Sequence, residues 1–207
     1  MRAALAGLAI DVSSLAELGS RVVLPEAGRT YAENAAAKAR VAAETTRLAA
    51  LADDSGLEVD DLGGEPGVHT ARYFGADLSD AEKVARLLAR LEGLPPERRA
   101  ARFRCLIALA WPRGEGGGEA AAPGRVELFE GVCEGVLATE ARGAGGFGFD
   151  PVFIPAGESL TFAQLPPERK AAISHRARAL AKVRAFLAGR PAGDRPPGQG
   201  KSAAGTA

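Results

Sequence analysis

Cysteine is scarce in this sequence, and its two occurrences, Cys105 and Cys133, show no spacing that is typical of a metal site. Each lies in an apolar run, where a buried free thiol is the expected form of the residue. The pattern therefore excludes a disulfide framework or a cysteine-bound zinc as the basis of the fold.

An excess of charge of either sign is also missing. Lys plus Arg and Asp plus Glu both total 26, so the formal net charge is zero. A protein that binds duplex nucleic acid normally carries a basic excess or a basic stripe. We therefore expect no nucleic-acid partner, and any nucleotide ligand should be small.

A long hydrophobic run is absent too. Apolar residues follow Arg2, but Asp11 and Glu17 interrupt them before a signal-peptide core could form. No later run approaches the length of a membrane span. We expect a cytoplasmic protein without a membrane partner.

The residues that are present indicate one folded domain over 1–189, followed by a polar, Pro- and Gly-rich tail over 190–207 that we expect to be disordered. A flexible connector is expected at 112–124. After a short helical remnant at the N-terminus, we predict strands at 9–12, 21–25 and 48–54, the last followed by a second extended stretch up to 62. Further strands are predicted at 102–112, as one or two strands within 125–141, and as a short strand ending at 155. Helices are predicted at 30–46, 79–92 and 166–188, the last as one helix or two. This order predicts an α/β fold with a mixed central sheet and flanking helices.

Asp53 and Asp54 are adjacent carboxylates after an apolar run, followed by Ser55 and Gly56. Neighbouring side chains on a strand point to opposite faces, so we expect the strand to end here and the backbone to aim both carboxylates outward. A hard cation such as Mg²⁺ would offset their mutual repulsion. A self-capped Asp-Ser-Gly turn explains the same residues without a ligand.

Two glutamates near the first long helix are candidates for a metal-binding or catalytic role. Glu33 completes a capping box with Thr30, and this structural role competes with a metal or catalytic one. Glu26 follows Pro25 in a loop, and the residues around it leave its role open.

A glycine-rich stretch, GAGGFGFDP, runs over 143–151. Glycines permit positive φ and close approach of the backbone to a ligand, and the two phenylalanines could stack on a base whose edge Asp150 would recognise. A tight turn with core phenylalanines is the alternative. The glycine-rich stretch is not a Walker loop, because no Gly-Lys-Ser/Thr follows it.

Basic groups gather near the C-terminus, where Lys170, His175 and Arg176 fall on a helical segment. Lys and Arg can bind phosphate as a point charge and as a bidentate fork. A solvated helix face is the alternative interpretation.

Taken together, the segments TYAENAAAKAR, ADDSGLEVDDLGGEPGVHTARYFG, RFRC, GGFGFDPVF and ERKAAISHR resemble the inosine triphosphate pyrophosphatase family, also called the dITP/XTP pyrophosphatases. They cover most of residues 25–188 in the family's order. The resemblance implies an elongated α/β fold with two lobes around a substrate cleft, usually as a homodimer. It implies hydrolysis of ITP, dITP and XTP to the monophosphate and pyrophosphate with Mg²⁺.

The resemblance also assigns roles to residues. Asp54 matches the general base and a metal ligand, Asp53 matches its acidic neighbour at the metal, and Glu26 is the only local carboxylate for the second metal ligand, with Glu33 as the alternative. The substrate contacts that it implies are Ser55, Phe147, Gly148, Phe149, Asp150, Lys170, His175 and Arg176, with Lys38 facing the phosphates. Among these, Phe149 is the expected stacking residue.

One part of the family pattern is missing from this sequence. The family normally opens with a strand and a Thr/Ser-x-Asn-x-x-Lys phosphate loop, whereas this chain starts at MRAALAGLAIDV. We favour a true start codon upstream over a shortened protein. The alternative function is a non-catalytic purine-nucleotide-binding module that lacks the phosphate loop.

Overall fold

The computed structural model describes residues 1–113 and 124–189, so the predicted tail and most of the predicted connector lie outside the described residues. Four strands form one sheet in the order β1-β2-β3-β4, with bounds β1 Ala50–Val59, β2 Ala100–Ala110, β3 Val126–Leu137 and β4 Phe153–Pro155. The helices are α1 Tyr31–Thr46, α2 Asp80–Arg90, α3 Pro167–Ile173 and α4 His175–Ala188, with short 3₁₀ turns at 2–5, 60–62, 67–69 and 96–98. The prediction of an α/β fold with flanking helices is confirmed.

All strand pairs in the described sheet are antiparallel, so the predicted mixed sheet is wrong for these residues. The strands predicted at 9–12 and 21–25 are also wrong, since both segments are irregular coil. Their apolar residues satisfy strand propensity, but a strand also needs a neighbour that accepts its backbone hydrogen bonds. No such pairing is found for them within residues 1–113 and 124–189.

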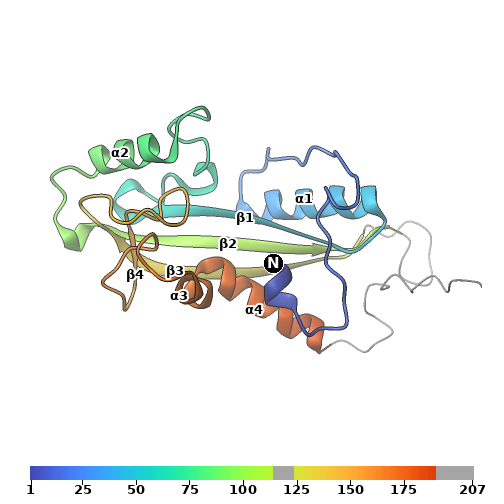
Figure 1. The fold of residues 1–207 in the computed structure, drawn as a ribbon. Coiled ribbons are helices and arrows are strands. Elements are labelled where there is room, and N and C mark those ends of the chain that lie inside the picture. Colours follow the sequence, from blue (N-terminus) through green and yellow to red (C-terminus); the bar gives the residue numbers. More distant parts are fainter. Residues whose placement is uncertain (114–123, 190–207) are drawn as a thin grey trace, which may run out of the picture.

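The helices cover the long strands from both sides (Figure 1). α1 packs on β1 and β2, α4 packs against β3 and β2 from the opposite face, and α2 lies toward the other end of the strands. Three apolar clusters result: one around α2 and the 149–165 segment, one between α4 and the sheet, and an alanine-rich one under α1. The clusters under α1 and α4 therefore lie on the two faces of one half of the sheet, and the cluster around α2 packs at the other half.

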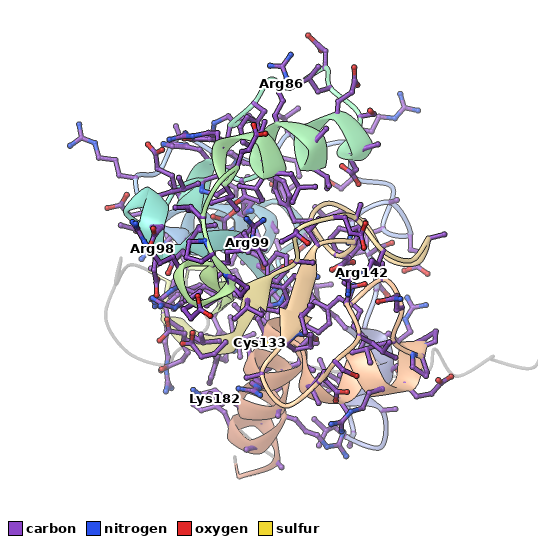
Figure 2. The ribbon with its side chains drawn as sticks, turned by 90° about the vertical axis from the view of Figure 1, so that its left-hand side faces the viewer. Arg86, Arg98, Arg99, Cys133, Arg142 and Lys182 are labelled. Atoms are coloured by element: carbon purple, nitrogen blue, oxygen red, sulfur yellow. The ribbon has the colours of Figure 1, made fainter. Side chains whose placement is uncertain are left out.

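Arg99 closes the end of this sheet and is almost fully buried. Its guanidinium donates to the backbone carbonyls of Leu91, Leu137 and Ala138 at 2.8–2.9 Å. Figure 2 shows it between the segment that follows α2 and the end of β3, while Arg86 and Arg98 point outward. A buried cation with three acceptors ties the α2 segment to the sheet.

Both cysteines are free and buried, as predicted. Burial raises the pKa of the Cys105 thiol to about 11, so this side chain stays protonated at neutral pH. None of the described helices combines the length and the apolar character that a membrane crossing requires.

Candidate active site

The two adjacent aspartates lie inside β1 and not at its end, which corrects the prediction from the sequence. β1 runs without a break from Ala50 to Val59, so Asp53 and Asp54 alternate between its faces. Asp53 bonds to α4, and Asp54 bonds to α1. The expected repulsion between the two carboxylates is resolved because each has its own basic partner on its own side of the sheet.

Asp54 is held by two side chains from α1. Lys38 Nζ donates to Asp54 Oδ1 at 2.8 Å, and Asn34 Nδ2 donates to Asp54 Oδ2 at 3.1 Å. Asn34 and Lys38 are four residues apart, so they lie on one face of the helix. Lys38 Nζ also reaches Glu26 Oε1 at 3.4 Å, which brings a second carboxylate to this cluster.

The alanines of α1 explain why these side chains come so close to the strand. Ala35, Ala39 and Ala43 are fully buried and pack on small residues of the sheet, Ala52, Ala108 and Ala110. Small side chains on both surfaces allow the helix backbone to approach the strands closely. The short Asn34 side chain can then reach a carboxylate on β1.

Glu26 and Asp54 are the donors that fit a magnesium ion here. Mg²⁺ prefers one or two carboxylates together with phosphate oxygens and water, and Lys38 already places a cationic group between this pair. Within residues 1–113 and 124–189, no group of three or more His, Cys, Asp or Glu side chains is placed to hold a metal ion. Glu26 and Asp54 would therefore supply two carboxylates, and the remaining ligands of an ion would be phosphate oxygens and water.

Asp53 and Glu33 do not belong to that donor set. Asp53 points to the other face of β1, where it pairs with Arg176, so this arrangement does not bring it beside Asp54 and Glu26 as a ligand of the same ion. Glu33 accepts a hydrogen bond from the Arg29 amide at 2.7 Å, while Thr30 Oγ1 accepts from the Glu33 amide at 3.1 Å. The predicted capping box is confirmed in part: Thr30 caps the helix through the Glu33 amide, but the Glu33 carboxylate accepts from the Arg29 amide and not from the Thr30 amide.

On the opposite face, Asp53 pairs with Arg176 at the start of α4. Arg176 donates through Nε and one terminal nitrogen to Asp53 Oδ2 at 2.9 and 2.7 Å, and Ser55 Oγ donates to the same oxygen at 3.3 Å. Ser174 caps the helix by accepting from the Ala177 amide. The cap fixes where α4 begins and so where Arg176 points.

Gly131 of β3 is a site-forming residue that the sequence analysis did not single out. A Cβ added there would lie 2.1 Å from the carbonyl oxygen of His175 and 2.5 Å from the amide nitrogen of Ala179. Only glycine permits this approach of α4 to the sheet. The glycine in the middle of an otherwise apolar strand pattern was the available signal.

His175 is buried beside this cluster. Its ring stacks on Phe103 with centroids 4.8 Å apart and planes 14° apart. Burial, reinforced by the charges of Arg176 and Lys170, lowers the pKa of His175 to about 3, so the imidazole is neutral. Its Nδ1 has no hydrogen-bond partner among the described residues, and a buried polar atom of this kind normally has one.

The glycine-rich loop presents one phenylalanine and buries the other. Phe147 is 63% exposed, whereas Phe149 is 2% exposed and packs in the core near Phe74. The expectation that Phe149 stacks on a base does not fit its burial in this structure, and Phe147 is the ring that the loop exposes. Lys170 Nζ lies 4.9 Å from the Phe147 ring centroid, and the Arg176 guanidinium lies 6.0 Å from it.

Asp150 organises the same loop. Its Oδ2 accepts from the Phe147 amide at 2.8 Å and pairs with the Lys170 ammonium. A Cβ on Gly146 would lie 2.0 Å from this oxygen, so the loop wraps tightly around the carboxylate. Asp150 is buried and its carboxylate binds both the Phe147 amide and Lys170, so it stabilises the loop in this structure.

The predicted residues thus form two groups on opposite faces of β1. Glu26, Lys38 and Asp54 form the first, and the second contains Asp53, Ser55, Phe147, Asp150, Lys170, His175 and Arg176. A cavity of about 630 Å³ adjoins β1 at Leu51 and Ala52, and Val12 and Leu15 are among the residues that line it. None of the residues of either group lines it, so it is not the predicted cleft between two lobes.

The two groups of residues lie on either side of β1, next to the edge of this strand that does not pair with β2. β1 is the edge strand of the described sheet, with β2 on one side only. Its other edge is closed at Leu57 by a hydrogen bond from the amide to Thr70 Oγ1, and at Glu58 by a bridge to Pro66. The stretch that contains Asp53, Asp54 and Ser55 has no strand partner on that side within residues 1–113 and 124–189.

Comparison with known proteins decides which family this arrangement represents. The model of the Ham1 family matches residues 1–186. The chain belongs to the Ham1 family. It is 46% identical over 175 residues to a dITP/XTP pyrophosphatase of Geobacillus kaustophilus (strain HTA426), covering 84% of this chain and 80% of that protein.

Other Ham1 relatives agree. A dITP/XTP pyrophosphatase of Desulforamulus reducens is 47% identical over 177 residues, covering 86% of this chain and 83% of the relative. The solved structure of a HAM1 protein from Coxiella burnetii has a TM-score of 0.80 and 38% sequence identity, with 91% of each chain covered. The family resemblance and the fold class inferred from the sequence are confirmed.

Proposed function

We propose that this Ham1 protein hydrolyses non-canonical purine nucleoside triphosphates, namely dITP, XTP and ITP, to the monophosphate and pyrophosphate. The names of its relatives support this reaction. The observation that carries it in this chain is Asp54, a largely buried carboxylate fixed by Lys38 and Asn34, with Glu26 bound to the same Lys38 ammonium.

In the proposed mechanism, Asp54 acts as the general base. A water molecule attacks the α-phosphorus, Asp54 accepts its proton, and the bond from the α-phosphorus to the bridging oxygen breaks to release pyrophosphate. Lys38 orients the carboxylate through Oδ1 and adds positive charge beside the phosphates. Glu26 and Asp54 would hold Mg²⁺, which supplies charge neutralisation at the phosphate oxygens when bound.

Base recognition is assigned to the opposite face of β1. Phe147 offers an exposed ring for stacking, and Lys170 and Arg176 lie close to that ring. His175 is neutral, and its buried Nδ1 has no hydrogen-bond partner among the described residues, so we assign this nitrogen to the 6-oxo edge of the purine. A site built on such hydrogen bonds discriminates strongly, because a base with an amino group there leaves buried polar atoms unsatisfied.

The nucleotide would cross the open edge of β1, with its base beside Asp53 and its phosphates beside Asp54. This position uses the alternation of the strand, which sends neighbouring side chains to the two faces. It also gives Ser55, next to both aspartates, a place beside the sugar. The two groups then act on one ligand although they lie on different faces of the sheet.

Phosphate release from ITP, measured with malachite green and added inorganic pyrophosphatase, tests the proposal. We expect Mg²⁺-dependent turnover of ITP and XTP well above that of ATP and GTP. Asp54→Asn should lower kcat by at least ~100-fold, because general-base catalysis contributes about 10²–10⁴-fold. Asp77→Asn, an exposed carboxylate on another segment, is the matched control and should keep the parent rate.

Parent-like turnover by Asp54→Asn would contradict the mechanism. Binding of inosine monophosphate without any turnover by the parent protein would contradict the activity and leave a binding module. Removal of Mg²⁺ with EDTA should abolish turnover, and unchanged rates in EDTA would exclude the role of the ion.

We also propose a cytoplasmic homodimer. Two free buried thiols suit a reducing compartment. Leu128 and Val136 are half-exposed apolar residues on β3, and a partner subunit could cover them. A monomer mass in light scattering at micromolar concentration would contradict the dimer.

A further inference from the structure

One contact joins the glycine-rich loop to a helix that the proposed mechanism does not use. The Gly148 amide donates to Asp80 Oδ2 at 2.6 Å, across 68 residues of sequence. Asp80 is the first residue of α2. In Figure 1 the loop before β4 rises toward α2, where this bond is made.

The loop needs external support at this point. Gly146 and Gly148 flank Phe147, and both have positive φ angles, 74° and 59°. Glycine has the greatest backbone freedom in the unconstrained chain, so such a segment loses the most entropy when it is ordered. The Phe147 amide is held by Asp150, and the next amide is held by Asp80. The two carboxylates therefore fix consecutive peptide groups at the exposed ring.

α2 is a firm anchor for Asp80. Ser79 and Glu82 form a full capping box directly around it, and Leu87 is fully buried in the adjoining core. Lys83 and Arg86 donate to the carbonyls of Ala71 and Phe74 at 2.9 and 3.1 Å. Because other contacts hold the helix, the position of Asp80 does not depend on its bond to Gly148.

We propose that Asp80 is a positioning residue for base recognition, which holds Gly148 and so fixes the orientation of the Phe147 ring. The inference rests on the proposed function, in which Phe147 stacks on the purine. Without the bond, the loop samples other conformations, and binding has to select the competent one. The apparent affinity for the base then falls by the fraction of loops that remain competent.

Three variants separate this role from a general effect of charge or stability. Asp80→Ala removes the acceptor, Asp80→Asn removes the charge but keeps an oxygen that can accept from Gly148, and Asp77→Ala removes a nearby exposed charge. Asp77 makes no hydrogen bond or ion pair among the described residues. Inosine monophosphate binding is measured by calorimetry, and ITP turnover gives kcat and KM.

We expect Asp80→Ala to bind inosine monophosphate about fivefold more weakly, as loss of one partly solvated hydrogen bond implies. KM for ITP should rise by a similar factor while kcat stays within about twofold, because Asp54 and Lys38 lie on the other face of β1. Asp80→Asn and Asp77→Ala should both remain near the parent in affinity.

Parent-like affinity in Asp80→Ala would overturn the proposal. So would an equal loss in Asp80→Asn, because charge and not the hydrogen bond would then be responsible. If Asp80→Ala lowers kcat and leaves KM unchanged, a positioning role at the base is wrong. Failure of the parent protein to bind inosine monophosphate would instead refute the proposed function, and this inference with it.

Discussion

Replacing His175 by phenylalanine should remove a pH dependence from the stability of this protein. The imidazole is buried, stacks on Phe103, and lies beside the cations of Arg176 and Lys170. A phenyl ring can keep the stacking contact but cannot take up a proton. The variant therefore isolates the cost of protonating this one side chain in the folded state.

The magnitude follows from the difference in pKa between the two states. The pKa of His175 falls from 6.5 to about 3 on folding, so the unfolded chain binds the extra proton first as the pH decreases. The stabilisation is complete above pH 6.5 and is lost progressively as the pH falls toward 3. Between pH 7.5 and 5.5 the parent should lose about 1.4 kcal/mol that the variant does not lose.

Urea unfolding at these two pH values, followed by circular dichroism, measures the difference directly. His69→Asn is the matched control, because it removes the other of the two histidines and leaves the His175 site intact. This control should retain the slope of the parent. Equal pH slopes for the parent and His175→Phe would refute the burial argument, and with it the neutral imidazole assigned to base recognition.

Two further predictions concern the loop and the core. Phe147→Ala should weaken inosine monophosphate binding by about tenfold, because stacking on an aromatic ring contributes about 1–3 kcal/mol per base, while Phe147→Trp should retain it; parent-like affinity in the alanine variant, measured by calorimetry, would exclude stacking. Arg99→Met should lower the free energy of unfolding by about 3 kcal/mol or more, because three buried carbonyls lose their donor. The exposed Arg98, which pairs with Asp61, is its control, and Arg98→Met should change stability by less than about 1 kcal/mol in urea unfolding.

Local signals in the sequence predicted the helices well. Thr30 begins α1, Ser79 begins α2 with a capping box, and Ser174 separates α3 from α4. Each start depends on a side chain and an amide three residues apart, so the information is contained in one short window. The single strand β3 and the short β4 were also within the predicted ranges.

The strands failed where the deciding contact was distant. Residues 9–12 and 21–25 have strand-like composition, but the described sheet has no partner for them. β1 continues past Asp53 because β2 pairs with it along its whole length, and Arg176, 123 residues away, pairs with that carboxylate on its own face. The roles of Phe147 and Phe149 were exchanged for the same reason, since only the packing of Phe149 near Phe74 decides which ring is buried.

The alternation of Asp53 and Asp54 also changes how the paired carboxylates should be understood. If the two adjacent aspartates bound one ion, replacing either of them should change metal binding in the same way. On a continuous strand they would serve different ends of the proposed ligand, because Asp54 pairs with Lys38, which also reaches Glu26, while Asp53 pairs with Arg176. Removing Asp53 should then free Arg176 and disturb base recognition, whereas removing Asp54 should stop the chemistry. The adjacency in sequence therefore connects the two halves of the site through a single strand.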